Sequence, residues 1–139
     1  MNLYRHTVHY YETDKMGITH HSNYIRWMEE ARVDFLEQIG WGYDKLEKSG
    51  IMSPVIGVDC KYKTSTTFSD EILIDVKVEE FKGVKLKLKY IMVRESDGAV
   101  VCEGHSEHCF VSADGKLLRL QREQPELCEV MQSLAESNE

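Results

Sequence analysis

A single long amphipathic helix constrains the fold of this chain more than any other feature. Between about Ser22 and Ile39, apolar residues recur every three or four positions, and charged residues occupy much of the remaining surface. Ser22 or Asn23 can cap the start of this helix, and Gly40 can end it. No helical pattern returns at this length until the C-terminus, so other elements must cover the apolar face of the helix.

Extended segments with alternating apolar and polar residues make up most of the remaining sequence. The pattern predicts strands over residues 3–11, 51–65, 72–79, 85–92 and 99–112. The dipeptides Lys82-Gly83 and Asp97-Gly98 are typical of tight turns between strands. The last four strands are therefore expected to follow one another as in a meander. This pattern predicts an α+β fold, an antiparallel sheet with one helix on a single face.

Two shorter helices complete the expected elements. One is predicted at residues 43–49 and the other at about 124–135, with a polar tail from Glu136 onward. The strand over 99–112 also indicates how the sheet meets the long helix. Gly104 and Ser106 lie at the centre of one of its faces, and small residues there let a helix approach closely. We expect that face to receive the helix.

Length and charge limit the classes of function. The 139 residues suit a single domain, spanning 1–139, and the formal net charge of −7 argues against a nucleic-acid partner. No apolar run reaches the ~20 residues of a membrane span, and the N-terminal residues lack a signal-peptide core. A cytoplasmic protein is expected. The four cysteines are widely spaced, which favours reduced thiols without a metal role.

The polar loop before the long helix carries the main candidate chemistry. Asp14, His20 and His21 lie between the first strand and the helix start. A helix N-terminus offers unpaired N–H donors and the positive end of the helix dipole. Together with a carboxylate, these donors can support attack on a carbonyl, because the developing oxyanion needs stabilisation and the attacking group needs a base or must itself be a nucleophile.

The loop and helix together resemble a known family. The pattern reads Tyr10-Tyr11-x-x-Asp14-x-x-Gly17-x-x-x-His21-x-Asn23-Tyr24, followed by Arg26-Trp27-x-Glu29-x-Ala31-Arg32. It resembles the hotdog-fold acyl-CoA thioesterases of the 4-hydroxybenzoyl-CoA thioesterase and Tol–Pal-associated types, from the first strand to about Val111. The resemblance implies a curved antiparallel sheet wrapped around the long helix. It also implies homodimers or homotetramers with active sites at subunit interfaces, and hydrolysis of acyl-CoA to a free acid and CoA without a cofactor.

The same resemblance implies roles for individual residues. Asp14 matches the catalytic carboxylate, as general base or as nucleophile. His21 matches the position whose backbone N–H faces the thioester carbonyl, and a role for its ring stays open. Tyr10 matches a tyrosine implicated in some members, with core packing as the alternative. The candidates for substrate binding are Gly17, Asn23, Tyr24, Lys61, Lys63 and Arg94.

Some features depart from the family pattern or point elsewhere. Residues 66–70 replace a common proline-aspartate pair, and Lys15-Met16 stands where small residues or proline are frequent. His105 and Cys109 share a strand face, but two ligands do not make a zinc site, so no metal is expected. Two alternatives remain. A hotdog dehydratase would carry a His-Phe-Pro type motif, which is missing, and a non-catalytic acyl-CoA-binding module is disfavoured by Asp14.

Overall fold

The computed structural model describes residues 2–137. The strands are β1 (Tyr4–Thr7), β2 (Val55–Tyr62), β3 (Glu71–Phe81), β4 (Lys85–Arg94) and β5 (Val100–Cys109). The helices are η1 (Tyr10–Glu12), α1 (Ser22–Gln38), α2 (Tyr43–Lys48), α3 (Leu120–Glu123) and α4 (Pro125–Ser137). None of these helices has the length and apolar character that a membrane crossing requires.

The strands form one antiparallel sheet in the order β1-β3-β4-β5-β2. The predicted α+β class is confirmed, and so are the hairpins that join β3, β4 and β5. The expectation of a four-strand meander was wrong, because β2 pairs with β5 and not with β3. β1 and β4 occupy the two sides of β3, so the free edge of β5 is the side left for β2. β2 therefore ends the sheet and exposes Val55, Ile56, Val58 and Tyr62.

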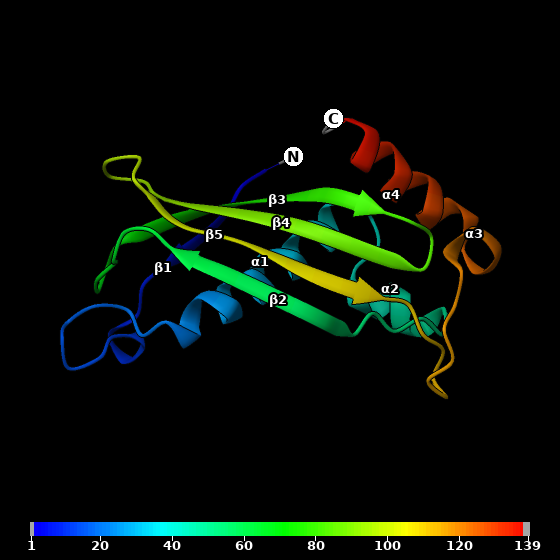
Figure 1. Cartoon of the computed structure of the whole chain (residues 1–139), viewed down its shortest axis with the longest axis horizontal. Helices are drawn as coiled ribbons and strands as arrows, with labels where there is room; N and C mark the ends of the chain where they lie inside the picture. The colour runs from blue at the N-terminus through cyan, green and yellow to red at the C-terminus, as the bar shows by residue number, and fades with distance from the viewer. Residues whose placement is uncertain (1, 138–139) are drawn as a thin grey trace.

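Helix α1 supplies the centre of the core. Figure 1 shows α1 lying along one face of the sheet, behind the strands in this view. Trp27, Met28 and Phe35 project from α1 and are at most 3% exposed. Their partners on the sheet include Ile74, Leu88, Tyr90 and Met92, which are also buried. Burial of this many large apolar side chains is the main favourable contribution to folding.

The C-terminal helices cover the end of the core that α1 leaves open. Leu120, Leu127 and Met131 are buried there, and α4 lies beside β3 (Figure 1). The predicted helix at about 124–135 is present, although α4 continues to Ser137 where a polar tail was expected. The remainder of that tail, residues 138–139, lies outside the described residues.

Candidate active site

The first strand is shorter than its sequence predicts. β1 ends at Thr7, and residues Tyr10–Glu12 form a 3-10 turn where an extended segment was expected. The physical reason is the side chain of Glu12, which folds back to accept the His9 N–H at 2.8 Å. This bond closes the turn and redirects the chain, so that the loop carrying Asp14 lies beside the start of α1.

The loop around Asp14 is a closed, hydrogen-bonded unit. Thr13 and Thr19 form an isolated β-bridge across its base, and the Asp14 N–H donates to the Ile18 carbonyl at 2.9 Å. Gly17 turns the chain with φ of +79°, a conformation that favours glycine, and its N–H donates to the Asp14 carbonyl. Asp14 Oδ1 accepts the Met16 N–H at 2.8 Å, whereas no partner is found for Oδ2 among residues 2–137. The carboxylate thus keeps one oxygen available.

The start of α1 leaves a backbone donor available at His21. The N–H of His20 donates to Glu12 and that of Ser22 donates to His20 Nδ1, but in the described chain the His21 N–H has no acceptor. The His20 ring thus accepts the N–H of the first helical residue, whereas Ser22 and Asn23, the caps expected from the sequence, lie inside the helix, which begins after His21. The His21 ring stacks on His20 with 4.3 Å between centroids. An unpaired N–H at a helix start is suited to hold a developing oxyanion.

Asp14 and His21 line one cleft of about 240 Å³. Its lining is Asp14, Met16, Ile18, Thr19, His21, Tyr24, Tyr62, Lys63, Thr64 and Ser65. The rings of Tyr62 and Tyr24 lie 5.2 Å apart and form an aromatic wall. Burial raises the pKa of Tyr24, and burial also raises the pKa of Tyr62, so both phenols are neutral donors near neutral pH. The cleft therefore combines one carboxylate, Asp14, and one cation, Lys63, with polar and aromatic groups.

The structure places the other predicted loop residues outside this lining. The Tyr10 side chain is 75% exposed, and its ring lies edge-on to Phe68 at 5.6 Å. Asn23 turns away from the cleft and donates through Nδ2 to the carbonyls of Glu12 and His20. The Gly17 carbonyl accepts the Thr67 hydroxyl at 2.8 Å, which holds the loop against the chain before β3.

Of the three predicted cations, only Lys63 lines the cleft. Lys61 is exposed on β2 but does not line it. Arg94 uses its guanidinium elsewhere: Nε and Nη2 donate to Asp97, and Nη1 donates to the Ser65 carbonyl at 2.9 Å. Arg94 thus braces the segment that follows Lys63.

Several residues of this region were not found from the sequence. Thr66 is 1% exposed and links Thr19 to the Tyr24 hydroxyl, at 2.6 and 3.1 Å. Tyr62 reaches the cleft because β2 pairs with β5, and no local pattern shows this pairing. Glu12 lies only two residues before Asp14, yet a carboxylate between tyrosine and threonine carries no signal of burial. One ring nitrogen of His6, one ring nitrogen of His9 and one carboxylate oxygen of Glu12 also lie within 4.8 Å of one another.

Comparison with known proteins gives a consistent family. The family model described as the thioesterase-like superfamily matches residues 8–136. The DHNA-CoA thioesterase of Staphylococcus aureus superposes with a TM-score of 0.90 at 31% identity, over 99% of this chain and 95% of that one. A hypothetical protein of Aquifex aeolicus superposes with a TM-score of 0.85 at 33% identity, over 93% and 98%.

One relative found by sequence comparison agrees with these structures. The Bacillus subtilis (strain 168) protein YneP, whose name marks it as a proposed acyl-CoA thioesterase, is 31% identical over 107 residues, or 77% of each chain. The curved sheet around a central helix and the family match confirm the resemblance that the loop motif indicated. The chain therefore belongs to the thioesterase-like superfamily and is a thioester hydrolase of the hotdog fold.

Proposed function

We propose that this protein hydrolyses an acyl-CoA thioester to a free acid and CoA at the cleft that Asp14 and His21 line. The observation that carries the proposal is the presence in one cleft of a carboxylate oxygen and a backbone N–H that both lack a hydrogen-bond partner among residues 2–137. Relatives whose names specify CoA thioesters support the choice of substrate class. Asp14 supplies the reacting carboxylate, and the His21 N–H supplies the oxyanion donor.

Two routes use these groups. In the first, Asp14 takes a proton from water as the water oxygen attacks the thioester carbonyl carbon. In the second, Asp14 attacks that carbon itself, and water then cleaves the resulting anhydride. In both, the carbonyl oxygen becomes an oxyanion next to the His21 N–H, and the carbon–sulfur bond breaks as this oxyanion collapses. In the first route Asp14 passes the proton that it took from water to the CoA sulfur. In the second route CoA leaves as its thiolate when the anhydride forms, and a proton is released when water cleaves the anhydride. Losing a single oxyanion donor costs about 3–4 kcal/mol in characterised enzymes, so the N–H is a major contributor.

Lys63 is proposed as the main cation that binds the CoA phosphates. Its ammonium lies at the cleft, where it can meet the negative charge of CoA phosphates in a protein whose net charge is −7. Lys61 is the next cation along β2 and can extend this contact. Tyr24 and Tyr62 present aromatic surface to the acyl group or the pantetheine chain.

A homodimer that pairs two β2 edges is proposed as the working form. β2 presents unpaired backbone groups and four half-exposed apolar side chains, which is typical of an edge that pairs with another chain. Tyr62, at the end of β2, and the next residues line the cleft. A partner on this edge would therefore lie beside the cleft and complete it.

Thiol release from a panel of acyl-CoAs tests this function. We expect turnover by the wild-type protein and loss of turnover in Asp14→Ala, with acyl-CoA binding kept when measured by calorimetry. Tight binding without turnover by the wild-type protein would instead support the non-catalytic acyl-CoA-binding module. Equal turnover by the variant would contradict the role of Asp14.

A further inference from the structure

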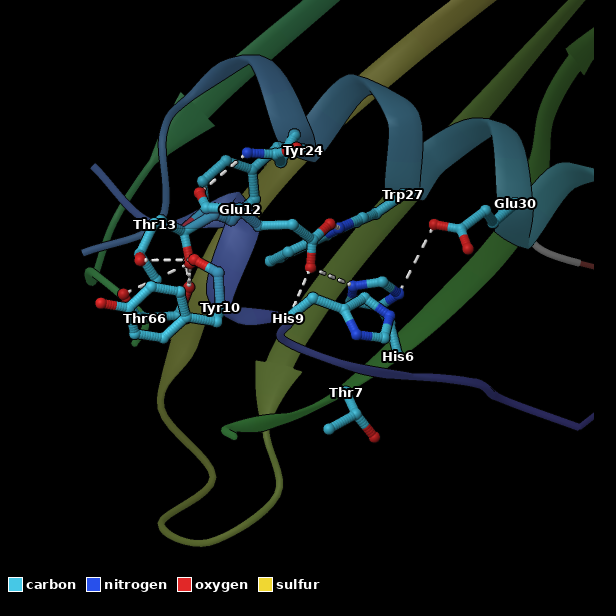
Figure 2. A network of polar contacts seen from close by, with 12 residues as sticks. His6, Thr7, His9, Tyr10, Glu12, Thr13, Tyr24, Trp27, Glu30 and Thr66 are labelled. Atoms are coloured by element: carbon cyan, nitrogen blue, oxygen red, sulfur yellow. Dashed lines mark hydrogen bonds and ion pairs between the residues drawn. The ribbon is translucent and has the colours of Figure 1, made fainter. Parts of the chain in front are cut away.

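The carboxylate of Glu12 is buried outside the cleft and is held by three donors. It is 5% exposed and does not line the cleft around Asp14. Oε1 accepts the His9 N–H at 2.8 Å and faces His6 Nε2 at 2.9 Å, while Oε2 accepts the Trp27 Nε1–H at 2.7 Å. Figure 2 shows Glu12 between the 3-10 turn, β1 and α1, with these side chains converging on it.

The protonation states in this cluster follow from its donors. The His9 N–H and the Trp27 indole can only donate, and an ionised Glu12 carboxylate can only accept, so with Glu12 ionised the facing nitrogen of His6, Nε2, carries a proton. Burial alone would raise the pKa of Glu12, but the hydrogen bonds from His9, His6 and Trp27 outweigh it and hold the pKa below its ordinary value. The other His6 nitrogen, Nδ1, faces Glu30 Oε2 at 3.5 Å. Each oxygen of Glu12 is thus held by at least one N–H donor, Oε1 by two and Oε2 by one.

The backbone of Glu12 makes a second set of contacts. Its carbonyl accepts the His20 N–H at 2.8 Å and the Asn23 Nδ2–H at 3.0 Å. Glu12 thereby joins β1, the 3-10 turn, the first turns of α1 and the end of the loop that carries Asp14. Asp14 lies two residues after Glu12, and His21 directly follows His20. Glu12 therefore contributes directly to the relative placement of these two reacting groups, beside the Thr13–Thr19 bridge and the bond from Thr67 to Gly17.

We propose that Glu12 is a positioning residue, whose ionised carboxylate fixes the Asp14 loop against the N-terminus of α1. The inference rests on the proposed function, because it concerns the geometry of the same reaction. Charge-assisted hydrogen bonds in a buried site are strong and directional, so they define one placement of the loop. A misplacement of about 1 Å can cost on the order of a hundredfold in rate, which makes such a clamp effective.

Glu12→Gln tests this role with little change in shape. The glutamine amide nitrogen can only donate, and it must face either the Trp27 indole or the His9 N–H. In either orientation two N–H donors point at each other without an acceptor. We expect kcat to fall by about tenfold or more while KM stays within about threefold. Glu29→Gln is the matched control, since Glu29 is exposed on α1, the helix that Glu12 contacts through Trp27, and its kcat should stay within about twofold of wild type.

A double variant separates positioning from general destabilisation. In Glu12→Gln with Trp27→Phe, the opposed indole donor is absent, and the kcat loss should be smaller than the product of the two single losses. A loss equal to that product, or an unchanged kcat in Glu12→Gln, would overturn the proposal. If Glu12→Gln does not fold, Trp27→Phe removes one donor to the Glu12 carboxylate, and an unchanged kcat there is equally contradictory.

The outcome also distinguishes the two proposals. A wild-type protein without thioesterase turnover would contradict the proposed function. An active wild-type protein that loses turnover in Asp14→Ala but keeps its full kcat in Glu12→Gln would contradict only the positioning role.

Discussion

Gly104 of β5 lies directly beneath Met28 of α1, so closely that a Cβ at position 104 would overlap the Met28 methyl group and the Asp59 carbonyl oxygen. The contact sets how near the helix comes to the sheet. It also confirms that small residues on this face of β5 receive α1. Since Asp59 belongs to the neighbouring strand β2, the absence of a side chain at Gly104 lets both α1 and the edge strand β2 lie close to β5.

Gly104→Ala is expected to destabilise the fold by at least about 1–3 kcal/mol, the usual cost of overpacking a core. Met28 can move its flexible end, but the Asp59 backbone cannot yield without disturbing the β2–β5 pairing. Urea unfolding measures the effect. Gly57→Ala is the control, because a Cβ there meets only the side chain of Glu107 and should cost less. Equal midpoints for the two variants would contradict the close approach of α1.

His108 predicts a pH dependence of stability. Burial, and secondarily the charge of Arg32, lowers the pKa of His108 to about 4 from its ordinary value of 6.5. Between these two pH values the unfolded chain binds a proton at His108 that the native protein does not, so stability falls as pH falls from about 6.5 to about 4. The shift in the pKa of His108 corresponds to a loss of about 3 kcal/mol in the free energy of unfolding once the pH is below about 4.

Unfolding of wild type and His108→Gln across this pH range isolates that contribution. The Gln variant can still bond to Ser106, which lies 2.7 Å from His108 Nε2 in the native protein. We expect the difference in stability between the two proteins to change with pH between 6.5 and 4 and to be flat below 4. A difference that is independent of pH would show that His108 is protonated equally in both states.

The exposed edge of β2 predicts a self-association that charge can disrupt. Val58 is 46% exposed, and a lysine there would place two like charges near each other across a β2–β2 pairing. Val58→Lys should raise the dimer dissociation constant by at least about a hundredfold, measured by sedimentation. Leu117→Lys, which also adds a charge at an exposed apolar position but lies outside β2, should leave the dimer intact. A wild-type monomer would contradict the proposal outright.

Replacing Lys63 by glutamine is expected to weaken substrate binding, whereas replacing Arg94 by glutamine is expected to lower stability. Lys63→Gln should raise KM for acyl-CoA severalfold with little change in kcat, because a phosphate contact binds substrate and transition state equally. Arg94→Gln should mainly lower stability, since its guanidinium already donates to Asp97 and Ser65. Steady-state kinetics at two salt concentrations and thermal melting separate these effects. A larger KM change in the Arg94 variant would reverse the assignment.

The elements that the sequence predicts well are those with strong local periodicity. α1 ends within one residue of its predicted boundary, and β3, β4 and β5 lie where alternation places them. The position of β2 could not be predicted, because strand order depends on which edge is left free by more distant pairings. The 3-10 turn at Tyr10–Glu12 was missed for a similar reason. The Glu12 carboxylate that closes the turn by accepting the His9 N–H is also held by Trp27 of α1, and that contact exists only in the folded chain.

The candidate site shows the same division between local and distant information. The spacing of Asp14 and His21 around the helix start is local, and both residues line the cleft. Tyr62 and Thr66 come from the opposite side of the fold, more than 35 residues later, and no pattern near them indicates their place. Tyr10 has a motif match, yet its side chain is exposed against Phe68 because the turn rotates it away from the cleft lining.

The most direct test of the account is the single-turnover rate of Asp14→Asn with an acyl-CoA substrate. Asparagine keeps the shape of the side chain and its bond from the Met16 N–H, but it removes the base or nucleophile. We expect the rate to fall by about 10²–10⁴-fold, while Asp70→Asn, a change of the same type in the segment before β3, keeps the rate within about tenfold. An Asp14→Asn protein that is folded, binds the substrate and hydrolyses it at the wild-type rate would contradict the central claim.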